Sequence, residues 1–346
     1  MDRYVELHCH SAFSLLDGAS LPENLARRAA ELEMPALALT DHDGLYGAVR
    51  FARACEREGV RSLIGAELAL DDDCHVTLLA MDATGYANLC CLITEAQFAG
   101  EKRHPALTWE MLAARSGGLL CLSGCREGEL SRLVLGDRRE HAVAAAGRYI
   151  EVFGRDRFFV ELQHSLYPDD AERCAVLVDI ARECGLQHVA TNNVHYARRE
   201  NHRLADVLTA IRHNVALQDA HQWLRPNSES YLKSADEMAE SFAPYPQALE
   251  NTLAIAERCH VELAFREHAL PPQSYRNRQT ADDRLRELCE RGLPDKYPPD
   301  ARQAARRQLD HELRIIAQTE LAGYFMLVWE IVNHSRERGI QVRGRG

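Results

Sequence analysis

The 346-residue sequence lacks the features that mark exported or membrane-anchored proteins. No run of eighteen apolar residues occurs, so we expect no membrane span. The first twenty residues contain His, Asp and Glu in place of a basic flank and an apolar core, so we expect no secretory signal. Eleven cysteines without regular spacing favour reduced thiols or metal ligands over a disulfide framework. These absences predict a cytoplasmic protein.

Positive charge is also scarce. The chain has 41 Lys and Arg against 52 Asp and Glu, a formal net charge of -11. This balance argues against a surface that coats nucleic acid, although it allows a local basic groove or a metal-mediated phosphate site. A hydrophobic content of 46% with 27% charge is typical of a folded globular protein. The length allows one large domain and part of a second.

The first two hundred residues alternate between predicted strands and predicted helices. Strands are expected over residues 4–7, 36–40, 60–66, 75–80, 118–123, 157–162 and 188–191. Helices are expected over residues 22–34, 45–58 and 85–98. Repeated strand and helix units favour parallel strands with helices outside, as an open doubly wound sheet or as a closed barrel.

Further helices and a linker are expected after residue 200. Ser20 and Ser234 each precede a Glu by three residues, the capping-box pattern of a helix start. Residues 201–212 and 246–259 are also predicted helices that close one side of the first domain. The Pro-rich and polar residues 271–283 are typical of a linker. We therefore expect domains at 1–270 and 284–346.

Polar residues cluster at the ends of the predicted strands. In an extended strand, His8 and His10 project to one side, and two imidazoles near a carboxylate can bind a divalent metal. The residues at or just past strand ends are His8, His10, His42, Glu67, Cys125 and His195. An open sheet gathers residues from two or three strands at its crevice, whereas a barrel gathers them from many. At least five strands contribute here, which favours a distorted seven-stranded (β/α) barrel.

Each ligand also has an ordinary structural interpretation. His75 begins a strand and can be a partly exposed residue at its start. Cys125 can be a small buried thiol, the common state of a free cysteine. Asp17 and Glu67 can be surface acids or helix caps. Only their joint placement favours a metal site.

The ordered motifs resemble those of the PHP (polymerase and histidinol phosphatase) domain. They are His8-Cys9-His10 with Asp17, Thr40-Asp41-His42, Gly65-Ala66-Glu67, His75, Ser123-Gly124-Cys125 and Asn193-Val194-His195. More narrowly, residues 7–19, 231–234 and 253–259 are similar to the alpha subunit of bacterial DNA polymerase III and its error-prone relatives. The resemblance covers essentially the whole chain.

This resemblance implies up to three metals at the barrel mouth. The first would take His8, His10, Glu67 and position 193, the second Glu67, His75 and Cys125, and the third Asp17, His42 and His195. Imidazole and thiolate suit Zn²⁺, and carboxylates suit Mn²⁺ or Mg²⁺. Metal-activated hydroxide near Asp17, His42 and His195 would hydrolyse a phosphoester, such as that of a 3′-terminal nucleotide. His164 and Asp41 are expected as outer partners that orient the ligands.

One residue departs from the family pattern. Asn193 stands where the family usually has Asp, and a neutral amide is a poorer ligand than a carboxylate. The first metal would then be weakly held. Three functions stay open: a polymerase-associated PHP domain that hydrolyses phosphoesters or proofreads, a free-standing phosphatase of the histidinol-phosphate type, and a structural PHP domain without catalysis.

The C-terminal residues resemble the opening of a polymerase palm. Leu309, Leu313 and Ile316 share one helix face, and a strand is expected over residues 340–342. The resemblance implies that Gly344, Arg345 and Gly346 bind the phosphate of an incoming nucleotide.

A parent polymerase would use Mg²⁺, DNA and deoxynucleotides. It would also contact a sliding clamp and other replisome or translesion subunits. No Asp-x-Asp motif follows the linker, so this polypeptide, expected to be part of a longer enzyme, should not extend a primer.

Overall fold

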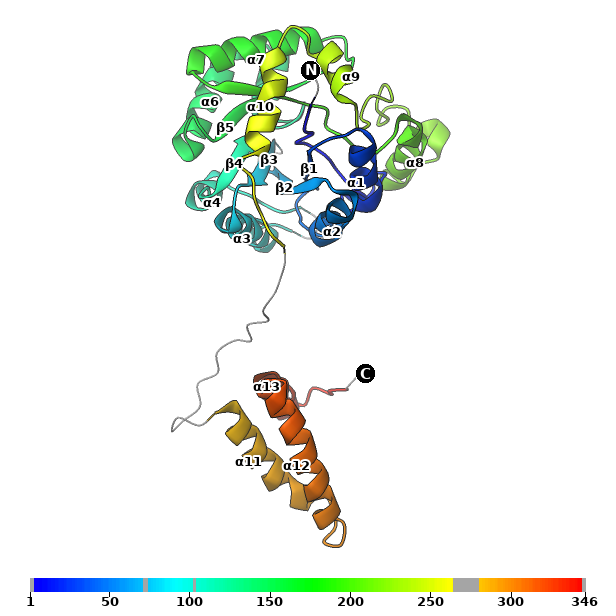
Figure 1. Ribbon diagram of the computed structural model, residues 1–346. Coiled ribbons are helices and arrows are strands. Elements are labelled where there is room, and N and C mark those ends of the chain that lie inside the picture. The colour runs from blue at the N-terminus through cyan, green and yellow to red at the C-terminus, as the bar shows by residue number, and fades with distance from the viewer. Residues whose placement is uncertain (1–2, 71–73, 102–103, 264–279, 344–346) are drawn as a thin grey trace. The chain divides into compact units, whose positions relative to one another are not determined.

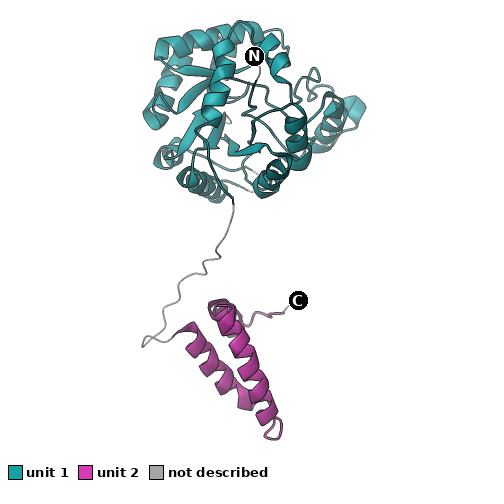
Figure 2. Ribbon diagram, in the orientation of Figure 1, with its two compact units in different colours: residues 1–263 teal, residues 264–346 magenta. Residues whose placement is uncertain are grey.

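The computed structural model describes residues 3–70, 74–101, 104–263 and 280–343 in two compact units. The units are Met1–Leu263 and Ala264–Gly346, and Figure 2 shows them in different colours. The expected linker, 271–283, lies mostly outside the described residues, and its last three residues form the first turn of α11 (Ala281–Lys296). Among the described helices, none alone has the length and composition to cross a membrane, and the pair 302–318 and 322–337 meets that criterion only with a bend of 114°.

The first unit contains one mixed sheet of six strands in sequence order. The strands are β1 (Ala36–Leu39), β2 (Arg61–Ala69), β3 (His75–Ala80), β4 (Leu119–Leu122), β5 (Phe158–Gln163) and β6 (Gln187–Thr191). The expectation of uniformly parallel strands is wrong, because β3 runs antiparallel to both β2 and β4. The short connection from residue 70 to residue 74 explains this direction. A parallel crossover needs about a dozen residues or more.

The expected N-terminal strand is not a member of this sheet. Residues 4–7 form no regular strand, so the described residues contain six strands where seven were expected. The segment instead makes isolated bridges, Glu6 to Leu37 beside β1 and Cys9 to Val194 after β6. The amide of Ala38 donates to the carbonyl of Glu6 at 2.9 Å. The N-terminal segment therefore contacts both edges of the sheet.

Helices surround the strands of this unit (Figure 1). They are α1 (Pro22–Glu31), α2 (Ala48–Glu58), α3 (Ala83–Ala99), α4 (Trp109–Ala114), α5 (Glu129–Leu135), α6 (Arg139–Phe153), α7 (Asp170–Cys184), α8 (His202–Arg212), α9 (Ala235–Ser241) and α10 (Pro246–Ala256). Two 3₁₀ turns, η1 (Arg199–Asn201) and η2 (Leu217–Asp219), flank α8.

The two predicted capping boxes have different outcomes. The Ser234 box is confirmed, because Ser234 Oγ accepts from the amide of Glu237, and Glu237 Oε2 accepts from the amide of Ser234 at 2.8 Å. The Ser20 box is wrong: the N-cap of α1 is Leu21, and no side chain caps this helix. The hydroxyl of Ser20 accepts from the amide of Ala197 at 2.9 Å instead. The hydroxyl of Ser20 therefore bonds to a residue far along the chain and not to the first turn of α1.

The inner face of the sheet changes from apolar to polar along the strands. Its apolar part is a buried cluster formed by Val5, Leu7, Ala36, Ala38, Leu63, Leu79, Leu120, Leu122, Phe159 and Val189, with Ile255 of α10 packed among them. Side chains two or four residues further along a strand share the same face. Glu67 follows Leu63, Glu161 follows Phe159, and all four are buried. The strands thus carry a polar layer on the same face as their apolar core.

The second unit consists of three helices, α11, α12 (Arg302–Gln318) and α13 (Ala322–Glu337). Leu285, Leu313, Ala322 and Met326 form its small buried cluster. The strand expected over residues 340–342 is wrong, because these residues have no regular secondary structure. After Gly339, at φ 70°, the apolar side chains of this segment stay exposed and find no neighbouring strand among the described residues. Gly344, Arg345 and Gly346 lie outside the described residues.

Candidate metal centre

Glu67 lies at the centre of a cluster of four imidazoles. Its Oε2 contacts Nε2 of His8 and lies 3.8 Å from Nε2 of His10. Its Oε1 contacts Nδ1 of His75 and lies 3.4 Å from Nδ1 of His42. The side chain is only 1% exposed. One buried carboxylate therefore faces two pairs of imidazoles through its two oxygen atoms.

The backbone pairing explains how distant residues reach Glu67. A parallel bridge joins His42 to Glu67, which extends the β1 and β2 pairing beyond the end of β1. The antiparallel register of β2 and β3 pairs Ala69 with His75, so His75 begins its strand close to Glu67. In the extended N-terminal segment, His8 and His10 project to the same side and both reach the carboxylate.

Gly124 sets the approach of Cys125 to this cluster. Its φ of +85° lies in the left-handed region, and a Cβ atom there would lie 2.2 Å from the carbonyl oxygen of His75. The backbone can therefore pass close to β3 only with glycine at this position. Cys125 Sγ then lies 3.6 Å from Nδ1 of His75 and 4.0 Å from Oε1 of Glu67.

Asp17 forms a second centre beside the first. Its Oδ2 lies 2.9 Å from Nε2 of His42 and 3.2 Å from Nε2 of His195. Its other oxygen accepts from Arg225 at 3.0 Å. The ring of His10 stacks on that of His42 with centroids 4.3 Å apart, which connects the two centres. Of the other seven predicted ligands, six thus contact Glu67 or Asp17, and, among the described residues, Asn193 does not.

Asn193 lies beside His195 with its side chain unpaired. The residue adopts a left-handed backbone with φ +45°, and its carbonyl accepts from Nδ1 of His195 at 2.8 Å. Its buried Oδ1 has no hydrogen-bond partner among the described residues, and the same holds for Nε2 of His10. A buried polar atom without a partner costs free energy, and an ion or water could satisfy it.

Burial and charge act in opposite directions on these groups. Burial favours the neutral form of Glu67, but the neighbouring His8 and His75 hold the pKa of its carboxyl well below the usual range. Burial lowers the pKa of His10, and the nearby His42 and His195 lower it further. Burial and the charge of Glu67 raise the pKa of the Cys125 thiol. A thiolate there would need a cation beside it.

The donor atoms form three overlapping groups whose members lie within 4.8 Å of one another. The groups are His8, His10 and Glu67; His42, Glu67 and His75; and His10, His42 and His195. Imidazole nitrogens together with carboxylate oxygens suit Zn²⁺ or Mn²⁺. The shared residues and the unpaired His10 Nε2 fit a centre that holds more than one divalent cation.

Two predicted outer partners have different surroundings. Asp41 is buried and accepts from the amide of Ser11 and the hydroxyl of Ser14, each at 2.7 Å. These bonds fix the turn that carries Asp17. Nδ1 of His164 is buried and has no hydrogen-bond partner among the described residues.

Two residues of the site were missed in the sequence. Glu161 is fully buried on β5 and its Oε1 lies 2.7 Å from Nδ1 of His8. A charged residue inside the apolar run 157–162 was the available signal. Arg225, which contacts Asp17, had no signal, because it lies in an irregular connection 208 residues away in sequence.

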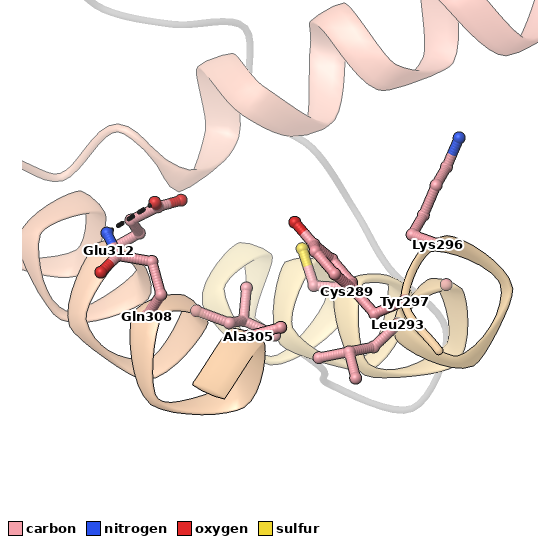
Figure 3. A pocket seen from close by; sticks show the side chains of 9 residues that line it. Cys289, Leu293, Lys296, Tyr297, Ala305, Gln308 and Glu312 are labelled. Carbon is pink, nitrogen blue, oxygen red and sulfur yellow. Dashed lines mark hydrogen bonds between the residues drawn. The ribbon is translucent and has the colours of Figure 1, made fainter. Parts of the chain in front are cut away.

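A separate cavity of about 280 Å³ lies in the second unit. Figure 3 shows its lining, which comes from α11, α12 and the residue after α11 and includes Cys289, Tyr297, Gln308 and Glu312. Gln308 donates to Glu312 at 3.0 Å on its wall. None of the predicted metal ligands lines this cavity.

Family comparisons match both units. Residues 6–165 match the PHP domain family, and residues 283–346 match the family described as the bacterial DNA polymerase III alpha NTPase domain. The chain therefore contains a PHP domain, followed by a segment of the DNA polymerase III alpha family. The predicted resemblance is confirmed.

Curated relatives extend this match over nearly all of the chain. The chain is 40% identical to an error-prone DNA polymerase of Mycolicibacterium paratuberculosis over 99% of its own length and 33% of the relative's. It is 35% identical to a DNA polymerase III subunit alpha of Treponema pallidum, again over 99% of its length and over 31% of the relative's. The chain is thus similar to these polymerases over nearly all of its own length and spans about one third of theirs.

Two solved structures are distantly similar to the chain. A candidate metal-dependent phosphoesterase from Bifidobacterium adolescentis has a TM-score of 0.41 and 16% identity, covering 69% of this chain and 95% of that one. A lesion-specific endonuclease from Pyrococcus furiosus has a TM-score of 0.37 and 13% identity, covering 56% of this chain and 48% of that one. Likeness at this level carries no functional argument.

Proposed function

We propose that the first unit is a metal-dependent phosphoesterase domain of a polymerase. The observation that carries this proposal is the gathering of three overlapping donor groups around Glu67, His10 and His42. The metals would be Zn²⁺ or Mn²⁺, and a bound metal would polarise a phosphoryl oxygen and activate water. The proposal assigns the ligands as His8, His10, Asp17, His42, Glu67, His75, Cys125, Asn193 and His195.

Glu67, Asp17 and Arg225 would have different roles in the two centres. Oε1 and Oε2 of Glu67 face different imidazoles, so this carboxylate can join two cations. Asp17 Oδ2 lies between His42 and His195 and can hold a proton shared with either ring. Arg225 keeps 26% of its side chain exposed and can offer its remaining N–H groups to an anionic substrate oxygen.

Closure of the sheet would keep these residues in place. On one side of the N-terminal segment, the backbone amide of Thr40, the residue after β1, donates to the carbonyl of Cys9 at 2.8 Å. On the other side, His10 donates to the carbonyl of Val194 at 2.7 Å. We propose that this segment acts as a seventh member of a distorted barrel and carries two ligands between its neighbours.

The whole polymerase would add substrates and partners that this chain does not itself establish. The proposal includes cytoplasmic location, DNA and deoxynucleotides as substrates, Mg²⁺ for nucleotide transfer, and contacts with a sliding clamp and other replisome or translesion subunits. Residues 284–346 would begin the palm, and Gly344, Arg345 and Gly346 would contact a nucleotide phosphate. The domain boundaries 1–270 and 284–346 belong to the same proposal.

A non-catalytic structural role is the second candidate, and Asn193 favours it. Its amide supplies no negative charge. A cation bound by His8, His10, Glu67 and residue 193 would therefore be held less firmly than if residue 193 were a carboxylate. A free-standing phosphatase of the histidinol-phosphate type has less support, because the match at residues 283–346 is to a polymerase domain.

Metal content and hydrolysis test these alternatives together. The purified chain is analysed for bound transition metals, then assayed for release of a 3′-terminal nucleotide from single-stranded DNA and of phosphate from histidinol phosphate. We expect at least one bound metal per chain and metal-dependent nucleotide release, lost with EDTA and restored by Mn²⁺ or Zn²⁺. Less than one metal per chain favours the structural role, whereas preference for histidinol phosphate favours the phosphatase. Bound metal without hydrolysis of either substrate contradicts the phosphoesterase proposal.

A further inference from the structure

We propose that Glu161 is a positioning residue that fixes the tautomer and orientation of His8, so that Nε2 of His8 is presented to the cation. This inference rests on the metal centre proposed above. It concerns a carboxylate that contacts neither Glu67 nor Asp17 among the described residues. Glu161 would act on the metal only through the imidazole.

The hydrogen bonds around Glu161 fix the direction of its bond to His8. Its Oε1 accepts from Nε2 of Gln163 at 2.8 Å and from Oγ1 of Thr191 at 2.5 Å. The same oxygen lies 2.7 Å from Nδ1 of His8. A carboxylate oxygen that already accepts from two donors is matched by an N–H of His8, so this contact suits a proton on Nδ1. Nε2, the atom that faces Glu67, is then the nitrogen left to bind a cation.

The ring has little freedom to adopt another arrangement. His8 and Glu161 both have 0% exposure, so water cannot replace the bond between them. One end of the imidazole contacts Glu161 and the other contacts Glu67. A flip of the ring would break both contacts inside a closed core. A carboxylate that fixes a ligand in this way typically contributes about 10–100-fold to metal affinity.

The chain offers a matched buried carboxylate outside the centre. Asp170 is 1% exposed and pairs with Arg173 at 2.7 Å. It also accepts from the amides of Ser165 and Tyr167 at 2.8 and 3.0 Å. It contacts none of the predicted ligands in the described structure. Replacing it measures the cost of losing a buried acid without touching His8.

The experiment compares the full chain with Glu161→Ala, Glu161→Gln and Asp170→Asn. Zn²⁺ and Mn²⁺ affinities are measured by competition with a chromophoric chelator, and folding is checked by urea unfolding. We expect Glu161→Ala to weaken the tightest Zn²⁺ site by about 10–100-fold. Glu161→Gln, which keeps an acceptor oxygen but loses the charge, should lie between it and the native chain. Asp170→Asn should leave the affinities within about twofold even where it lowers stability.

A second readout reports on the ring itself. Long-range ¹H–¹⁵N spectra of the Zn²⁺-loaded protein distinguish imidazoles protonated at Nδ1 from those protonated at Nε2, and His8→Gln identifies the signals of His8. We expect the Nδ1–H pattern in the native chain and its loss or mixing in Glu161→Ala. A structural role alone would change stability without changing this pattern.

Several results would overturn the inference. They are unchanged affinity and His8 pattern in folded Glu161→Ala, an equal loss of affinity in Asp170→Asn, or no metal binding by the native chain. If Glu161→Ala does not fold, native affinity and pattern in Glu161→Gln overturn it. A native chain that binds metal but hydrolyses nothing contradicts only the phosphoesterase proposal, and the inference about Glu161 stands or falls on the two readouts.

Discussion

The two units differ in what they bury. The first unit encloses charged and ionisable groups, among them Glu6, His8, His10, Glu67 and Glu161, each with at most 1% exposure. In the described part of the second unit, residues 280–343, every buried side chain is apolar. Burying an ionisable group is costly unless it is paired, so folding alone does not select for such a cluster. Among the described residues, the cluster of buried ionisable groups therefore distinguishes the first unit as the candidate for a functional site.

Exposed apolar side chains show the reverse difference. Along α13, the side chains of Tyr324, Phe325, Val328, Trp329 and Ile331 are between 40% and 57% exposed. Apolar side chains left in water at such density mark surfaces that contact something else. The first unit closes its core from its own residues, whereas the second presents part of its apolar surface. Stability measurements on matched variants can test this difference.

The largest expected effect is on stability, from matched Phe→Ala substitutions in the two units. Phe51 is fully buried in α2, so Phe51→Ala should lower the free energy of unfolding of the first unit by about 3–5 kcal/mol. Phe325 is 41% exposed, so Phe325→Ala should change stability by about 0.5 kcal/mol or less. Urea unfolding followed by circular dichroism measures both. Equal losses would show that α13 is covered as thoroughly as α2.

Thiol reactivity should separate a buried cysteine of the first unit from a partly exposed cysteine of the second. Burial and then the charge of Glu58 raise the pKa of Cys55 to about 12. Only the thiolate reacts, so at pH 8.5 Cys55 should react on the order of a thousand-fold more slowly than a free thiol. Raising the pH toward 12 should accelerate it. Cys289 is partly exposed and should be modified before Cys55. Peptide mapping after iodoacetamide treatment, with urea-unfolded chain as control, gives both rates, and equal rates would contradict the difference.

Replacing Glu67 should weaken metal binding by the first unit and leave the second unit unchanged. Because four imidazoles face this carboxylate, Glu67→Ala should weaken the tightest metal site by about 100-fold or more, beyond the cost of removing an outer partner. Glu95→Ala is the control, since Glu95 is 37% exposed and pairs with Arg115. Isothermal titration with Zn²⁺ measures both variants. Native affinity in Glu67→Ala would remove this residue from the centre.

The smallest effect concerns two capping boxes, one in each unit. Ser234 begins α9 and Thr280 begins α11, and each bonds to an acid three residues later. Ser234→Ala and Thr280→Ala should each cost about 1 kcal/mol. Hydrogen exchange should show faster opening of α9 in the first variant and of α11 in the second. Faster exchange in the opposite unit would mean that the two units unfold together.

Much of the fold follows from local patterns. Ala36 to Leu39 is a short continuous apolar run, and such a run favours a strand buried on both faces, which β1 is. The predicted direction of β3 was wrong because the hydrophobic pattern of a strand does not indicate whether it pairs in parallel or antiparallel. The short connection before His75 carried that information. The prediction of the Ser20 capping box was wrong because the hydroxyl of Ser20 accepts a hydrogen bond from the amide of Ala197, a residue far along the chain.

The site was predictable where a residue type is unusual for its place. His42 and Glu67 each follow a predicted apolar strand, which indicated them as site residues. The structure brings their side chains together. Glu161 was missed because a single acid in an apolar strand resembles an edge residue in sequence alone. Arg225 approaches Asp17 only through tertiary folding. The assignment of each ligand to a particular cation stays a prediction.

The position of the N-terminal segment has a consequence for protein synthesis. Val194 donates its amide to the carbonyl of His8 at 2.9 Å, so the partner that holds this segment emerges from the ribosome long after it. At bacterial elongation rates the delay is roughly 10–40 s. During that interval His8 and His10 of the nascent chain are not yet enclosed by the residues that follow β6. The proposed cation would therefore be bound only at the end of domain synthesis, and a ribosome stalled before residue 194 would present a sheet without the residues that hold the N-terminal segment.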